Sequence, residues 1–332
     1  EIRLSLVGSE MCIRDRHKVF VGALISTLLA FILYSANTRR VENAKLKVVA
    51  PQSSKVVKDK NKKKAKEPSV KKLKEPKVNS IEYSNHVTAK SGSNKKLTKI
   101  IKKVMGLDNS YQVAVQDLNN SNRFAVVSNT NKSHDANKAM KLFLLIALYE
   151  NEQQGKMGSK TAIKIKKSDK ASGDRMFQVN MAYGVAYLRE AMLKGNKTAS
   201  NALIRKIGVN NVDSVAKRMG ATQTTIAKNF NGSSYGKTTA NDLAKTMIGL
   251  YQGRVLNRQH ASKVLSTLAS SKPRPSLVNG ISGGVYAIGD NDFAVAIVQG
   301  RGNAYCISAW SSSNKNFNKL GTQVNNWFTK RK

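Results

Sequence analysis

Two lysines three positions apart are the residues of this chain whose types and spacing best suit chemistry. Lys138 and Lys141 stand at the start of an apolar run that covers 142–148. Residues three apart lie on the same face of a helix, so the two ammonium groups would be neighbours. Crowded ammonium groups bind phosphates or carboxylates, and each lowers the pKa of the other, which favours a nucleophilic amine. The alternative is that Lys138 points to solvent and that only Lys141 lines a cleft.

Other polar groups are weaker candidates. Ser133-His134-Asp135 contains the residue types of a hydrolytic triad, but neighbours in sequence cannot converge as a triad requires. The Gly-x-Gly at 300–302 lies between two expected strands, which indicates a turn and not a phosphate loop. The two cysteines, Cys12 and Cys306, are too few for a disulfide framework or a metal-ligand pattern. We therefore expect no metal and no cofactor.

The charge of the chain narrows the class of partner. The 332 residues carry a net charge of +37, of which +11 falls in 39–80 and +25 in 81–332. Such a field attracts polyanions: nucleic acid, anionic lipid or phosphate-rich wall polymer. The excess is lysine more than arginine, which suits point-charge attraction better than bidentate reading of bases. With no nucleic-acid motif either, we expect no specific nucleic-acid site; a general abundance of lysine in the source organism is the simpler alternative.

The N-terminal third divides into three segments. Residues 1–16 resemble the translation of a sequencing-library transposon end, so we expect a read-through artefact there. Residues 17–38 contain an apolar run long enough to span a bilayer, for which about 17 to 20 residues suffice. Bulky Tyr34 disfavours cleavage, which predicts a transmembrane anchor, with a cleaved signal segment as the alternative. Residues 39–95 are basic and lack apolar periodicity, which predicts a disordered linker.

Residues 96–332 have the patterns of a folded domain. Strand-like runs occur twice early and three times late, at 111–118, 123–128, 284–288, 292–298 and 305–310. Helical periodicity predicts helices at 97–105, 138–154, 185–192, 198–206, 212–219, 240–251, 259–269 and 316–330. Strands at both ends of the domain and helices between them imply one sheet built from both chain ends. The predicted fold class is α+β with an inserted all-helical half.

Several short segments resemble motifs of one enzyme family. Lys141-Leu142 and the apolar run after them resemble the end of Ser-x-x-Lys and its buried helix. Residues 198–204 resemble the segment after Ser-Asp-Asn, and 238–244 resemble a Thr-Thr-x-x-Asp-Leu-Ala helix start, in which Thr238 or Thr239 would cap the helix. Over about 95–330 the chain thus resembles the class A β-lactamase and D,D-peptidase superfamily of penicillin-recognising serine hydrolases. The resemblance implies a β-lactamase-like fold with a five-stranded antiparallel sheet.

The departures from the family motifs concern the residues that do the chemistry. The nucleophilic serine, three residues before the motif lysine, is replaced by Lys138. Ser-Asp-Asn falls on Gly195-Asn196-Lys197, and the lysine of Lys-Thr-Gly falls on Ile281. The glutamate that deacylates in β-lactamases is absent from 227–232. Together the four departures predict loss of serine acylation.

The family geometry also predicts a ligand site. It would bring Lys197 into the same cleft as Lys138 and Lys141, where the three ammonium groups would bind an anion. Ser282 and Gly283 would offer a hydroxyl group and a close backbone approach, as the third family motif does. Asn196 occupies a motif position without a confident catalytic role.

Three functions remain open from the sequence. The first is a membrane-anchored, extracytoplasmic and catalytically degenerate domain that binds cell-wall material, such as peptidoglycan or another anionic polymer. The second is an active serine hydrolase acting on β-lactams or peptidoglycan peptides, and the third is an electrostatic polyanion tether. The positive-inside rule would place the basic linker in the cytoplasm, but the resemblance places the domain outside, and we expect that side.

Overall fold

The computed structural model describes residues 86–313 and 316–330. The predicted artefact, the predicted anchor and most of the predicted linker lie outside these residues. Among the helices of the described ranges, none is long and apolar enough to cross a membrane.

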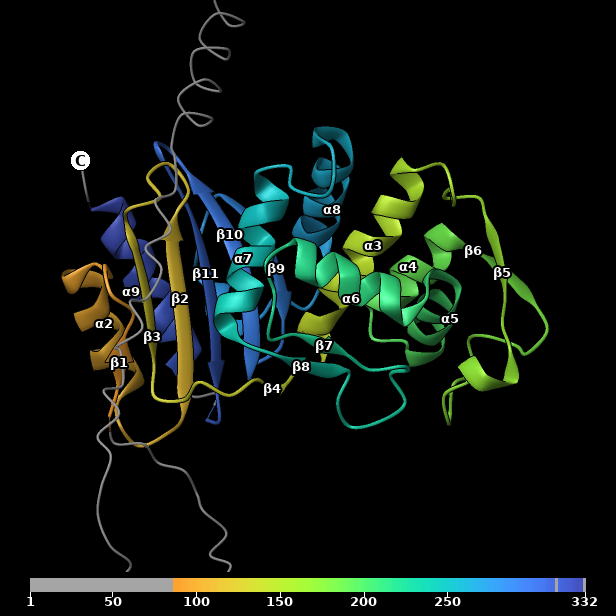
Figure 1. Cartoon of the computed structure of the whole chain (residues 1–332), viewed down its shortest axis with the longest axis horizontal. Helices are drawn as coiled ribbons and strands as arrows, with labels where there is room; N and C mark the ends of the chain where they lie inside the picture. Colours follow the sequence, from red (N-terminus) through yellow and green to blue (C-terminus); the bar gives the residue numbers. More distant parts are fainter. Residues whose placement is uncertain (1–85, 314–315, 331–332) are drawn as a thin grey trace, which may run out of the picture. The chain divides into compact units, whose positions relative to one another are not determined.

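The centre of the domain is a six-stranded antiparallel sheet (Figure 1). In spatial order its strands are β1 (Thr88–Ala89), β3 (Phe124–Ser128), β2 (Tyr111–Asp117), β11 (Asn303–Ser311), β10 (Phe293–Gly300) and β9 (Gly284–Gly289). Five of them are the predicted strands, so the sheet built from both chain ends is confirmed. The sixth strand, β1, falls within the range that was expected to be linker. It forms because Thr88 and Ala89 pair with the edge of β3.

Helices follow the predicted pattern closely. They are α2 (Lys95–Met105), η1 (Lys138–Met140), α3 (Lys141–Gln153), η2 (Lys167–Asp169), α4 (Val185–Leu193), α5 (Lys197–Ile207), α6 (Val209–Arg218), α7 (Ala240–Tyr251), α8 (Arg258–Ser270), η3 (Ser276–Val278) and α9 (Phe317–Thr329). The predicted threonine cap is present at α7, where the Thr239 hydroxyl accepts from the backbone N–H of Asp242 at 3.1 Å.

Alternating side chains divide the hydrophobic core into two layers. Val113 and Val115 of β2 face one layer and Ala114 faces the other, as the two-residue period of a strand requires. Helices α2 and α9 cover the first face, and the helical half lies on the other side of the sheet (Figure 1). The sheet is therefore buried on both faces.

Helix α3 lies at the centre of the second layer. Ten consecutive residues, Lys141 to Glu150, are buried, so this helix is enclosed on all sides and not only along one face. A lysine at its first position is consequently drawn into the interior.

Short strands form two further small sheets. Strands β4 (His134–Asp135), β8 (Gly236–Thr238) and β7 (Thr225–Ile226) form one small sheet, and β5 (Ala162–Lys164) pairs with β6 (Ala182–Gly184). Gly236 has φ +141°, and a Cβ there would lie 2.2 Å from the carbonyl oxygen of Thr225. This position tolerates only glycine, and the tight approach fixes the preceding residue, Tyr235.

Candidate anion-binding site

Three lysines converge where the helical half begins. Lys138 lies in η1, Lys141 is the first residue of α3 and Lys197 is the first residue of α5. Lys141 is 2% exposed, and its Nζ donates a hydrogen bond of 2.7 Å to the carbonyl oxygen of Met192. Burial, together with the charges of Lys138 and Lys197, lowers the pKa of Lys141 to about 8. We call these three residues the lysine cluster.

A tyrosine ring lies beneath two of the three ammonium groups. The Nζ atoms of Lys141 and Lys197 each lie 5.8 Å from the ring centroid of Tyr235. That ring stacks on Phe230 with 4.4 Å between centroids and 6° between planes, which holds it in place. The electron-rich face of an aromatic ring attracts cations without neutralising them. Two positive charges therefore share one aromatic platform.

Lys138 and Lys197 form the outer part of the cluster. Lys138 is half-buried and its Nζ donates to the carbonyl oxygen of Pro273 at 2.9 Å. Burial lowers its pKa, and the negative charge of Asp290 opposes that shift. Lys197 lies 3.5 Å from each of the carbonyl oxygens of Asn231 and Gly232, which are long contacts.

The cluster has little negative charge to balance it. Throughout 86–313 and 316–330, none of its three lysines forms a salt bridge with a carboxylate. Their hydrogen-bond acceptors are neutral backbone carbonyls. An ammonium group has three donors, so each lysine keeps donors for a ligand. The arrangement suits binding of a phosphate or carboxylate, and Lys141 additionally holds a fraction of neutral amine near pH 8.

Two asparagines near the cluster have structural roles. Asn196 is the N-cap of α5, and its side chain accepts from the N–H of Ala199 at 2.8 Å. The sequence did not single out Asn201, which accepts from the N–H of Phe230 at 2.7 Å and donates to Asn231 Oδ1 at 2.7 Å. Asn201 thereby positions the segment that supplies carbonyls to Lys197. Its place beside Ala199, Ala202 and Leu203, on the buried side of α5, was the available signal for it.

The structure does not bring Ser282 and Gly283 to the cluster. Both precede β9 at its first end, where a Cβ on Gly283 would meet the carbonyl oxygen of Gln299 at 2.6 Å. Asp290, whose charge acts on Lys138, follows the other end of the same strand. A six-residue strand is about 20 Å long. The two predicted parts of the site therefore lie at opposite ends of β9.

The Ser133-His134-Asp135 segment is part of the connection between the halves. His134 stacks on Trp310 with 3.4 Å between ring centroids and 7° between planes. Burial lowers the pKa of His134 to about 4, so the ring is neutral at physiological pH. Its role is packing against the sheet.

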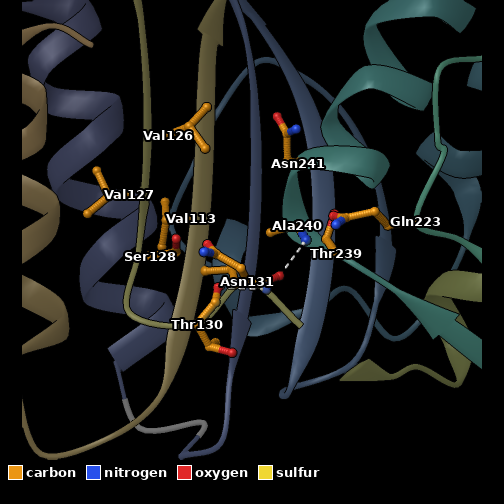
Figure 2. A pocket seen from close by; sticks show the side chains of 11 residues that line it. Val113, Val126, Val127, Ser128, Thr130, Asn131, Gln223, Thr239, Ala240 and Asn241 are labelled. Carbon is orange, nitrogen blue, oxygen red and sulfur yellow. Dashed lines mark hydrogen bonds between the residues drawn. The ribbon is translucent and has the colours of Figure 1, made fainter. Parts of the chain in front are cut away.

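A cavity separate from the lysine cluster lies between β2, β3 and the start of α7 (Figure 2). Its volume is about 200 Å³ and its lining residues are amides, hydroxyls and aliphatic side chains without formal charge. At its base Gln112 accepts from the N–H of Ala240 at 3.1 Å and donates to the carbonyls of Thr130 and Lys132. Because no charged side chain lines it, this cavity is a weaker candidate for an anion site than the lysine cluster.

Metal-ligating side chains are scattered in the described part of the chain. No three His, Cys, Asp or Glu side chains gather there as a metal site would require. Cys306 is buried in β11, and burial raises the pKa of its thiol.

The comparisons with known proteins agree with this fold. The model of the β-lactamase enzyme family matches residues 94–328. Among solved structures, PBP-A aligns with TM-score 0.63 and 16% identity, covering 72% of this chain and 97% of that one. A PBP-A mutant solved as an acyl-enzyme complex with penicillin G gives the same score and identity, with 72% and 98% covered. A β-lactamase from Sphaerobacter thermophilus aligns with TM-score 0.57 and 16% identity, covering 69% and 92%.

A penicillin-recognising serine hydrolase fold is therefore the class that the architecture defines. The chain belongs to the β-lactamase enzyme family. No protein with a curated description matches it. At 16% identity the structural likeness establishes the fold and leaves the activity open.

Proposed function

We propose that this domain is a catalytically degenerate member of its family that binds an anionic group of a cell-wall polymer in the lysine cluster. The observation that carries the proposal is the convergence of Lys138, Lys141 and Lys197, two of them over the ring of Tyr235, with no salt bridge to a carboxylate of the described residues. An anionic ligand would neutralise the positive charge that the protein itself leaves without a salt bridge.

Loss of acylation is supported by the position of Lys138. It precedes Lys141 by three residues, where the family resemblance requires the serine hydroxyl. A lysine there removes the acylating oxygen, and its side chain is held by the carbonyl of Pro273.

The cellular setting is part of the same proposal. We infer that residues 17–38 anchor the chain in the membrane and that the domain lies on the extracytoplasmic side. The part of the basic segment 39–95 that precedes β1 would then lie along the anionic surface to which the cluster binds, because like charges keep it extended and the polyanion attracts it.

The first experiment asks whether any nucleophile is acylated. The full chain, shown to be folded by circular dichroism, is incubated with a fluorescent penicillin beside PBP-A, and the intact masses are recorded. We expect an adduct on PBP-A and none on this chain. A stoichiometric adduct on this chain would overturn the proposal that it is catalytically degenerate, and peptide mapping would then identify the nucleophile.

The second experiment asks whether the cluster binds wall material. Sedimentation with purified cell walls is measured over a salt series for the wild type, for a K138Q/K141M/K197Q variant and for a control variant that loses three exposed lysines elsewhere, K99Q/K103Q/K319Q. Simple electrostatic tethering declines steeply with salt for all three proteins. We expect a salt-resistant fraction in the wild type and the control that the cluster variant lacks. If wall binding depends on salt in the same way for both variants, the lysine cluster has no specific role and electrostatic tethering alone accounts for the binding.

A further inference from the structure

A large pocket with several charged and hydroxyl side chains in its wall lies near the lysine cluster. It lies between α4 and α8, has a volume of about 660 Å³, and falls in the size range of sites for small ligands. Its wall includes Arg189, Glu190, Lys194 and Lys272, with Tyr187 at 45% exposure. The position of α4 and α8 in the helical half can be followed in Figure 1.

The pocket and the cluster share two stretches of backbone. Lys141 donates to the carbonyl of Met192, and the pocket wall continues with the next two residues, Leu193 and Lys194. Lys138 donates to the carbonyl of Pro273, and the pocket wall ends at the preceding residue, Lys272. Consecutive Cα atoms are about 3.8 Å apart, so the pocket wall begins within one or two residues of the carbonyl groups that hold Lys138 and Lys141.

The charges of the pocket favour a second anion. Lys194 is paired with Glu190 at 2.7 Å, whereas neither Arg189 nor Lys272 has a salt bridge within the described ranges. Arg189 instead lies over the ring of Tyr149 at 5.2 Å, which holds its guanidinium without neutralising it. The wall therefore keeps two positive charges outside salt bridges, of which Arg189 also acts on the nearby carboxylate of Glu190, beside the hydroxyl groups of Thr267, Ser270 and Ser271.

The side chains of the pocket wall indicate which kind of anionic polymer would bind there. Side chains of α4 and α8 form most of the lining, and helical backbone groups are already paired with one another. The pocket wall offers no free strand edge, so an extended peptide chain cannot be bound there by strand addition. Lysine and arginine together with hydroxyl groups are the donors that bind phosphate oxygens.

We propose that the pocket is a second anion subsite and that the ligand is a linear phosphodiester polymer spanning both sites. One phosphate would lie among the three lysines and a following phosphate beside Arg189 and Lys272. This inference rests on the proposed function and names the class of its ligand.

The test compares a single phosphate with a chain of them. Binding of glycerol 1-phosphate and of a synthetic six-unit glycerol phosphate oligomer to the full chain is measured by calorimetry at about 0.3 M salt, which weakens exposed contacts. Engagement of two linked sites should make the oligomer bind at least about tenfold tighter than the monomer. Equal affinities would overturn the proposal.

Variants then assign the second phosphate to the pocket. K272Q and R189Q should each weaken oligomer binding by about threefold to fivefold, the size of one exposed charge contact, and leave monomer binding unchanged. The matched control K319Q removes the same charge from an exposed position on α9 and should change neither. If K272Q and R189Q behave like K319Q, the second subsite is wrong.

Two further results separate this inference from the proposed function. K138Q should weaken the binding of both the monomer and the oligomer. If K138Q weakens binding but K272Q and R189Q do not, the lysine cluster is supported as an anion site and the second subsite in the pocket is rejected. If K138Q changes neither ligand, both proposals fail. An oligonucleotide with the same number of phosphates that binds as tightly through Lys272 and Arg189 would overturn the assignment to a base-free polymer.

Discussion

The helical half holds its cations in two different ways. Arg205 forms a bidentate pair with Asp169, at 2.7 and 2.8 Å, and Arg218 forms one with Glu150, at 2.6 and 2.7 Å. The lysine cluster has carbonyl oxygens and one tyrosine ring instead. Both arrangements lie against the same hydrophobic core, yet only the first neutralises its charges.

The difference separates scaffold from site. A bidentate carboxylate pair fixes two segments to each other, and Asp169 also accepts from the N–H of Lys166 while its own carbonyl accepts from Asn201. A carbonyl partner positions a lysine but leaves its charge to attract an anion. Salt bridges therefore hold the scaffold segments together, whereas the lysines without a salt bridge keep a charge that can attract an anionic ligand.

The largest expected effect comes from breaking a scaffold pair. Asp169→Asn removes the carboxylate from a side chain that is 3% exposed and leaves Arg205 with a neutral partner. Loss of one partner of a buried ion pair costs about 3–5 kcal/mol of the free energy of unfolding. Urea denaturation followed by circular dichroism measures this, with the exposed Asp108→Asn as control. A cost no larger than that of the control would show that the pair contributes little.

The equivalent change in the cluster should behave differently. Lys141→Met keeps the side-chain length, removes a buried charge without a carboxylate partner and leaves the Met192 carbonyl without its donor. Relief of the burial cost offsets the lost hydrogen bond, so we expect the free energy of unfolding to change by no more than about 1 kcal/mol. A loss comparable to that of Asp169→Asn would contradict the distinction between site and scaffold.

The pH dependence of stability sharpens the comparison further. The pKa of Lys141 is about 8 in the folded chain and 10.5 ordinarily, so between these values the unfolded chain binds more protons. Stability contributed by this residue therefore rises from about pH 8 to about pH 10.5, and below pH 8 the cost of burying its charge is fully present. The free energy of unfolding of the wild type should increase relative to Lys141→Met across that window. Parallel curves would show that Lys141 titrates normally.

The smallest effect belongs to an exposed pair. Lys194 and Glu190 are in contact at 2.7 Å, but their side chains are 70% and 63% exposed. Glu190→Gln should leave the urea midpoint unchanged within error, because solvent screens such a pair. A measurable shift would mean that surface pairs also serve as scaffold here.

Local patterns predicted the elements well because each signal lies within the element itself. The periodicity of 240–251 gave the bounds of α7, and the threonine before it gave the cap. Two early and three late strands gave the sheet. The short β1 lacked a signal, because a two-residue strand is defined by its partner β3 and not by its own sequence.

The candidate site was predictable only in part, because it depends on strand direction and on long-range packing. The spacing of Lys138 and Lys141 follows from helix geometry. Ser282 and Gly283 were placed by motif order, but order does not say which end of β9 faces the cluster. Tyr235 lies in an irregular segment, so no periodicity indicated that its ring would lie beneath two lysines.

The order of strands in the sheet has a consequence for how the chain folds. Strand β2 can pair with β3 soon after synthesis, but its other edge pairs with β11, and the adjoining residues Ser110 and Ser312 are 202 positions apart. Closing so long a loop is slow, and until β11 arrives β2 keeps an open edge that other chains can pair with. The domain is therefore most exposed to aggregation until β11 has been made and has paired with β2, which is when a chaperone would be of most use to it.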